Sequence, residues 1–142
     1  MFQLLRPLIR KVPVALTLFG STVAAGFPSP ADDYIEGSLD LNEHLIRRPS
    51  ATFLAKARGT SMRKAGILDG ALLIVDRSVE ARQDNIVIAA VNGELTCKYL
   101  DIRGKCLVSG NGRFPPILIN EEAGVQVLGV VMHVINRTCT RS

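Results

Sequence analysis

The 142-residue sequence has no tryptophan, few aromatic residues and no long apolar run. Aromatic residues make up 5% of the chain, although 47% of its residues are hydrophobic. A chain of this length and composition can form one domain with a real core, and that core must be aliphatic. Because no segment approaches the roughly 18 consecutive apolar residues of a membrane-spanning helix, we expect no membrane association.

A dense basic stripe is also missing. The net charge is +4, but residues 1–25 contain three basic residues and no acidic one. The remaining residues therefore contain 14 of the 17 basic residues and all 13 acidic ones, and are nearly neutral. With few aromatic side chains to stack on bases, this composition disfavours direct, sequence-specific DNA binding.

Cysteines are few, and their spacing is not that of a structural site. Cys97, Cys106 and Cys139 are odd in number and form no CxxC pair, which disfavours a disulfide framework or a zinc site. A glycine-rich phosphate loop and a dinucleotide fingerprint are missing too. We therefore expect reduced thiols, a cytoplasmic protein, and neither a metal nor another cofactor.

One segment favours the opposite compartment. Basic residues at 6, 10 and 11 precede an apolar stretch, 12–23, and small residues at 23–25. This order resembles a secretory signal that is cut after Ala25, although Pro13 and several polar residues interrupt it. A secreted, non-catalytic β-domain processed by signal peptidase therefore stays open as an alternative.

Residues 1–41 are predicted to form an extended N-terminal arm. Pro28 and Pro30 exclude a helix around residues 26–30, because each proline removes a backbone donor and forces its predecessor into extended geometry. An exposed extended segment is what a protease cleft binds, since substrates add as a strand. Residues 40–46 are predicted to form a short helical turn.

Residues 42–142 are predicted to form one β-rich domain. Asn92-Gly93 is a strong hairpin signal, because both residues tolerate positive φ. The alternation of apolar residues and the turn signals predict a compact, mostly antiparallel β-fold. The expected strands are 52–56, 71–75, 85–91, 94–101, 105–108, 117–119 and 125–134.

Ser61 is a candidate nucleophile because it follows a glycine turn at Gly59. A serine hydroxyl is a poor nucleophile unless a neighbouring base takes its proton. At a sharp bend, consecutive amides can face a developing oxyanion, and those of Thr60 and Ser61 are the natural candidates.

Lys98, thirty-seven positions after Ser61, is the candidate base. Alternation places Lys98 beside Thr96 and Leu100 on one face of its strand, so the amine is expected to meet apolar neighbours. Desolvation disfavours the ammonium form and lowers a lysine pKa, which would allow the amine to act as a general base.

The chain resembles the LexA/UmuD family of self-cleaving proteins over about four-fifths of its length. The resemblance rests on segments that occur in the family's order: 25–31 (AGFPSPA), 40–42 (DLN), 49–52 (PSAT), 59–62 (GTSM), 69–76 (DGALLIVD), 84–91 (DNIVIAAV), 96–98 (TCK) and 129–134 (GVVMHV).

This resemblance implies strongly bent antiparallel sheets, with Ser61 as nucleophile, Lys98 as base and Ala25-Gly26 as the scissile bond. It also implies a homodimer whose cleavage is stimulated by RecA filaments on single-stranded DNA. The trimmed dimer would then join the catalytic subunit of a Y-family, error-prone translesion polymerase in the SOS response. The arm is too short for the helix-turn-helix domain of LexA-type repressors, which argues against a repressor.

Overall fold

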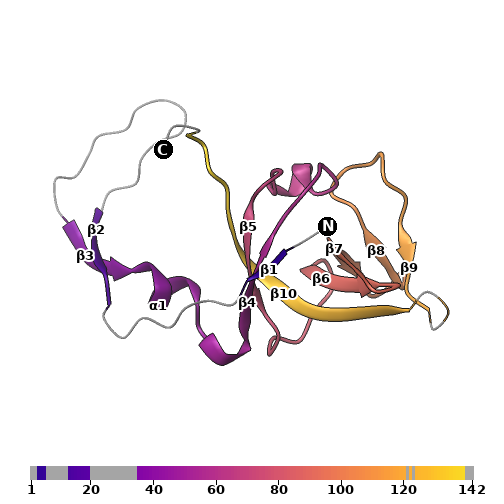
Figure 1. Ribbon diagram of the computed structural model, residues 1–142, viewed down its shortest axis with the longest axis horizontal. Coiled ribbons are helices and arrows are strands. Elements are labelled where there is room, and N and C mark those ends of the chain that lie inside the picture. Colours follow the sequence, from indigo (N-terminus) through magenta and orange to yellow (C-terminus); the bar gives the residue numbers. More distant parts are fainter. Residues whose placement is uncertain (1–2, 6–12, 20–34, 121, 123, 140–142) are drawn as a thin grey trace. The chain divides into compact units, whose positions relative to one another are not determined.

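A computed structural model of the chain describes residues 3–5, 13–19, 35–120, 122 and 124–139 (Figure 1). The chain divides into two compact units, one made of residues 1–8 and 48–142 and the other of residues 9–47. The predicted mostly β, antiparallel fold is confirmed, since the paired strands of both units run antiparallel.

The larger unit contains an eight-stranded sheet in the order β1-β4-β5-β10-β6-β7-β8-β9. Short 3-10 helices cover Pro49–Ala51 and Arg63–Ala65. The strands are β1 (Gln3–Leu5), β4 (Thr52–Lys56), β5 (Leu72–Asp76), β6 (Ile86–Val91), β7 (Glu94–Asp101), β8 (Cys106–Val108), β9 (Ile117–Leu118) and β10 (Val125–Ile135).

The smaller unit contains a two-stranded sheet of β2 (Ala15–Phe19) and β3 (Ile35–Asp40), followed by helix α1 (Leu41–Leu45). The Asp40 side chain caps this helix by accepting a hydrogen bond from the Asn42 amide at 3.0 Å. The predicted helical turn at 40–46 is thereby confirmed. Strands β1, β2 and β3 were not predicted from the sequence.

Strand β10 joins the two halves of the large sheet. It pairs with β6 through its first half and with β5 through its second, with register shifts at Val127/Gly129 and Val131/His133. Figure 1 shows β10 as the long strand that passes from β6 to β5. Irregularities of this kind bend a strand and increase its twist, which allows one strand to serve both halves.

Two hydrophobic clusters lie on opposite faces of β6 and β7. Neighbouring residues Val87 and Ile88 belong to different clusters, because successive side chains of a strand alternate between faces. In β7, Cys97 packs into the first cluster and Leu100 into the second. The predicted hairpin at Asn92-Gly93, with φ of 50° and 81°, joins these strands. Its register pairs Lys98 with Val87, which is fully buried. Both faces of β7 around Lys98 are therefore covered.

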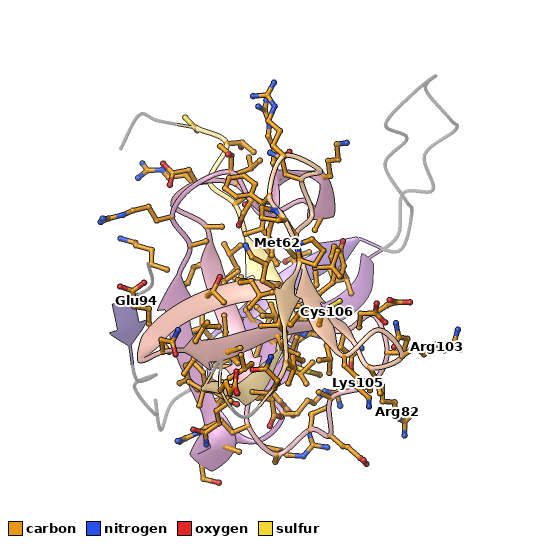
Figure 2. The ribbon with its side chains drawn as sticks, turned by 90° about the vertical axis from the view of Figure 1, so that its right-hand side faces the viewer. Met62, Arg82, Glu94, Arg103, Lys105 and Cys106 are labelled. Atoms are coloured by element: carbon orange, nitrogen blue, oxygen red, sulfur yellow. The ribbon has the colours of Figure 1, made fainter. Side chains whose placement is uncertain are left out.

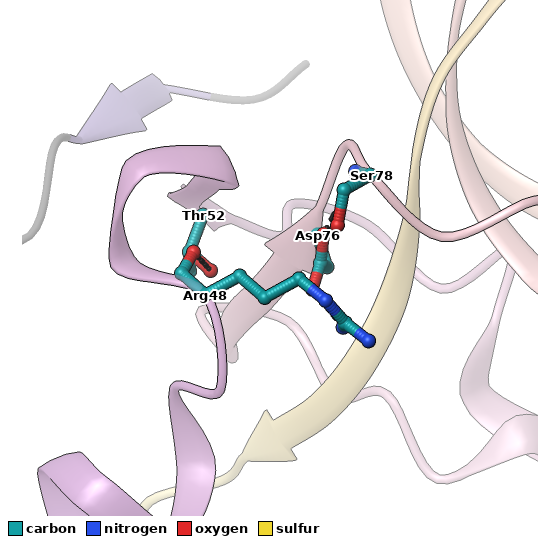
Figure 3. Close-up of polar contacts among 4 residues, drawn as sticks. All are labelled: Arg48, Thr52, Asp76 and Ser78. Carbon is teal, nitrogen blue, oxygen red and sulfur yellow. Dashed lines mark hydrogen bonds and ion pairs between the residues drawn. The ribbon is translucent and has the colours of Figure 1, made fainter.

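A buried carboxylate fastens the segment that leads into β4 to the end of β5 (Figure 3). Asp76 accepts hydrogen bonds from the Ser78 amide at 2.8 Å, the Ser78 hydroxyl at 2.6 Å and Arg48 Nη1 at 3.0 Å. The Thr52 hydroxyl donates to the Arg48 carbonyl oxygen at 2.7 Å. Burial alone would raise the pKa of Asp76, but the donors from Ser78 and Arg48 outweigh it and hold the pKa below its ordinary value.

The close approach of β10 to β5 requires glycine at position 129. A Cβ at Gly129 would lie 2.7 Å from Val75 Cγ1 and 3.1 Å from the Asp76 carbonyl oxygen. Val75 is fully buried, so neither group has room to move. We expect Gly129→Ala to lower the free energy of unfolding by about 1–3 kcal/mol in urea denaturation. Gly112→Ala is the matched control, because its Cβ would meet nothing within 4 Å; equal stability of the two variants would contradict this packing.

Candidate active site

Ser61 lies in the loop between β4 and β5, two residues before the 3-10 helix Arg63–Ala65 begins. Gly59 has φ of 93°, a left-handed conformation that glycine adopts without the steric cost of a Cβ. Its amide donates to Asp69 Oδ1 at 2.8 Å. Asp69, near the end of the β4–β5 loop, therefore fixes the turn that precedes Ser61.

The segment between β8 and β9 holds the other side of Ser61. The Ser109 hydroxyl donates a hydrogen bond to the Ser61 carbonyl oxygen. The Lys64 amide donates to the Gly110 carbonyl oxygen at 3.1 Å, and the Gly110 amide donates to Met62 Sδ at 3.1 Å. Met62, labelled in Figure 2, is only 3% exposed. Two loops distant in the sequence thus form one framework around the serine.

The structure brings Lys98 to Ser61. Lys98 Nζ donates to Ser61 Oγ at 2.8 Å, and the lysine is 7% exposed. In the described part of the chain no carboxylate lies within ion-pair distance of this amine. Burial lowers the pKa of Lys98 from its ordinary value. The arrangement places beside a hydroxyl an amine that loses its proton more easily than an ordinary lysine, which favours proton abstraction from serine.

Cys97, the neighbour of Lys98, does not compete for this role. Its side chain is buried on the opposite face of β7, and burial raises the pKa of the thiol to about 12. A thiol with such a pKa is uncharged at neutral pH and is a weak nucleophile. A negative charge on this thiol would raise the pKa of Lys98, but burial of the amine outweighs that effect.

Phe114 adds apolar surface to the lysine. Its ring centroid lies 5.7 Å from Lys98 Nζ, and the residue is 43% exposed. Neither Phe114 nor Ser109 was predicted from the sequence. Ser109-Gly110-Asn111-Gly112 is a turn-forming composition that predicts a loop, but nothing in the sequence indicates that this loop packs against Ser61.

Hydrogen bonds to the Thr60 carbonyl oxygen hold the peptide group that carries the Ser61 amide. The Thr60 carbonyl oxygen accepts from the Arg63 amide at 3.1 Å and from Asn111 Nδ2 at 3.3 Å. Within the described residues, neither the Thr60 nor the Ser61 amide donates to another protein group. Both donors are therefore available to an oxygen atom of a substrate.

Two pockets meet at Thr60 and Arg63. The smaller, of about 220 Å³, includes the apolar side chains of Ile67 and Leu68. The larger, of about 810 Å³, is within the size range of ligand sites. Its lining consists of Thr60, Arg63, Lys64, Asn111, Gly112 and Arg113.

The other predicted features are located as follows. Ala25 and Gly26, the predicted scissile residues, lie outside the described residues. Among the residues with described positions, no group of three or more His, Cys, Asp or Glu side chains could hold a metal ion. No helix in this part of the chain has the length and apolar character needed to cross a membrane.

A lysine amine beside a serine hydroxyl on a β-rich scaffold is the arrangement of hydrolases in which lysine replaces the histidine of the Ser-His-Asp triad. Residues 17–132 match the peptidase S24-like family, and the chain belongs to this family of self-cleaving serine peptidases.

Relatives support the same assignment. The chain is 44% identical over 121 residues to protein ImpA of Salmonella typhimurium, covering 85% of this chain and 83% of ImpA. It is 41% identical over 138 residues to protein SamA of the same species, covering 97% of both chains. The LexA repressor of Idiomarina loihiensis is 40% identical over 128 residues, covering 88% of this chain and 62% of the repressor. ImpA and SamA are UmuD-like proteins, so the resemblance inferred from the motifs is confirmed.

The buried amine should cost the folded protein stability. Because the pKa of Lys98 is lowered on folding, its penalty is full below the folded-state pKa and disappears as pH rises toward the ordinary 10.5. In a Ser61→Ala background, we expect Lys98→Met to raise the free energy of unfolding near pH 7. Urea denaturation should show that this advantage shrinks toward pH 10. A Lys98→Met variant that is less stable at every pH would contradict the desolvation.

Proposed function

We propose that the chain is a self-cleaving serine peptidase that cuts its own Ala25-Gly26 bond, with Ser61 as nucleophile and Lys98 as general base. The observation that supports this most is the 2.8 Å contact between the buried Lys98 amine and the Ser61 hydroxyl. Membership of the S24-like family supports the reaction class.

In this mechanism the neutral Lys98 amine takes the Ser61 proton while Oγ attacks the Ala25 carbonyl carbon. The amides of Thr60 and Ser61 donate to the resulting oxyanion. Collapse breaks the Ala25-Gly26 bond, and the Lys98 ammonium returns its proton to the Gly26 amine. Water then hydrolyses the acyl-serine, with Lys98 again as base, and releases the Ala25 carboxylate and free Ser61.

The tethered substrate explains how a slow peptidase can still act on one bond. Holding the scissile bond beside the nucleophile replaces a bimolecular encounter, an advantage of up to about 7–11 kcal/mol when alignment is good. If the docked state is rarely populated, an effector that favours docking accelerates the cut. We propose that RecA filaments on single-stranded DNA are this effector.

We also propose a cellular location, an oligomeric state and a partner for the protein. The protein acts in the cytoplasm as a homodimer, and the trimmed dimer becomes the accessory subunit of a Y-family, error-prone translesion polymerase during the SOS response to DNA damage. The similarity to the UmuD-like proteins ImpA and SamA supports this role.

Spontaneous cleavage of purified protein tests the assigned roles. We expect the rate to rise with pH as Lys98 passes through its lowered pKa and then to level off. Ser61→Ala should remain intact. Lys98→Ala and Lys98→Arg should each slow cleavage by about 10²–10⁴-fold, since arginine keeps the charge but cannot lose its proton. Gel electrophoresis and N-terminal sequencing measure the product, which should begin at Gly26.

Wild-type-like cleavage by Lys98→Arg would exclude Lys98 as the base. Adding RecA, an ATP analogue and single-stranded DNA at neutral pH should accelerate the wild type and leave Ser61→Ala intact. Secretion is tested by fractionating cells that express Ser61→Ala. A chain that begins at Gly26 in the periplasm would favour processing by signal peptidase over self-cleavage.

A further inference from the structure

The 810 Å³ pocket beside Ser61 is strongly cationic. Arg63, Lys64 and Arg113 line it, and its lining contains no acidic residue. All three cations are exposed, and no carboxylate in the described part of the chain forms an ion pair with them. Three unpaired positive charges around one concave surface favour an anionic ligand.

The pocket is built from two loops that are tied together. The Lys64 amide bonds to the Gly110 carbonyl oxygen, and Asn111 Nδ2 bonds to the Thr60 carbonyl oxygen. The cations therefore come from both walls: Arg63 and Lys64 from one loop, and Arg113 from the other. Because Thr60 belongs to the lining and precedes Ser61, an occupant of the pocket lies next to the nucleophile.

The sequence around the predicted scissile bond is divided by charge. Residues 1–25 contain three basic residues and no acidic one, whereas residues 26–40 contain Asp32, Asp33, Glu36 and Asp40 and no basic one. The two sides of the bond thus carry formal charges of +3 and −4. A cationic pocket beside Ser61 attracts the second side and repels the first.

We propose that this pocket is the docking site for the acidic segment on the carboxyl side of the scissile bond, with Asp32 and Asp33 as the carboxylates it holds. The occupant is the arm of the same chain or of a second copy. The inference rests on the proposed function, and it adds the feature that sets the direction and register of the substrate. Asp32 is seven residues beyond Ala25, a reach of up to about 25 Å.

Charge reversal on each side tests the pairing. We expect Asp32→Lys with Asp33→Lys, and Arg63→Glu with Arg113→Glu, each to slow spontaneous cleavage by about tenfold, the sum of a few exposed ion pairs. The four changes combined should bring the rate back to within about threefold of the wild type. Arg103→Glu is the control and should leave the rate unchanged, since Figure 2 shows Arg103 at the edge of the body, away from Met62.

Salt provides an independent readout. Wild-type cleavage should slow as ionic strength rises, because the Debye length falls from about 10 Å at 0.1 M to about 3 Å at 1 M. The inference is overturned if either reversal alone leaves the rate unchanged. It is also overturned if the combined variant is slower than both. A third overturning result is weaker binding of single-stranded oligonucleotide after pocket reversal while arm reversal has no effect, which would assign the pocket to nucleic acid.

Docking is also measured without cleavage. In a chain carrying Ser61→Ala and Cys139→Ser, a Tyr34→Cys, Gly112→Cys pair keeps every charge of the pocket and of Asp32 and Asp33. We expect mild oxidation to cross-link this pair at low salt but not at 1 M, and to leave Tyr34→Cys with Arg103→Cys unlinked. If the cysteine pair cross-links but the wild-type protein never cleaves itself, docking is supported and the proposed peptidase activity is rejected. If the wild-type protein cleaves itself but the cysteine pair does not cross-link at low salt, docking in this pocket is rejected and the peptidase activity stands.

Discussion

The contact between the Lys98 amine and the Ser61 hydroxyl is the interaction on which the rest of the site depends. A buried ammonium without a carboxylate is unfavourable, so the fold must hold an amine that is easily deprotonated. Strand β7 does this because it is covered on both faces, with Cys97 in one cluster and Leu100 in the other. The cost of burying this amine lowers the stability of the folded protein.

The serine is positioned by its surroundings on both sides. Asp69 holds the Gly59 turn, Ser109 holds the Ser61 carbonyl oxygen, and Met62 anchors the loop in the core. Two further hydrogen bonds, from the Lys64 amide to the Gly110 carbonyl oxygen and from Asn111 Nδ2 to the Thr60 carbonyl oxygen, join the two loops that line the cationic pocket. In the proposed mechanism, the nucleophile, the oxyanion donors and the docking site therefore all belong to this pair of loops.

Much of the β-fold could be predicted from the sequence because its signals are local. Asn92-Gly93 specifies a hairpin. Apolar alternation predicts the first and last residues of strands β4 to β10 to within about two residues. Ser61 and Lys98 were candidates because a glycine turn and a strand lysine are local features too, and their roles as nucleophile and base stay predictions. The packing of residues 109–114 against Ser61 could not be predicted from the sequence. Ser109 and Ser61 are 48 positions apart, and no periodic pattern of residues indicates that they meet. Strands β1, β2 and β3 were missed because short strands depend on their partners rather than on their own composition.

The pKa of the Lys98 amine, measured by NMR titration of its side-chain resonances in the Ser61→Ala protein, tests the central claim most directly. We expect a titration midpoint clearly below the ordinary 10.5. A midpoint at or above 10.5 would contradict it, because the amine would then be solvated or paired and could not serve as a base near neutral pH.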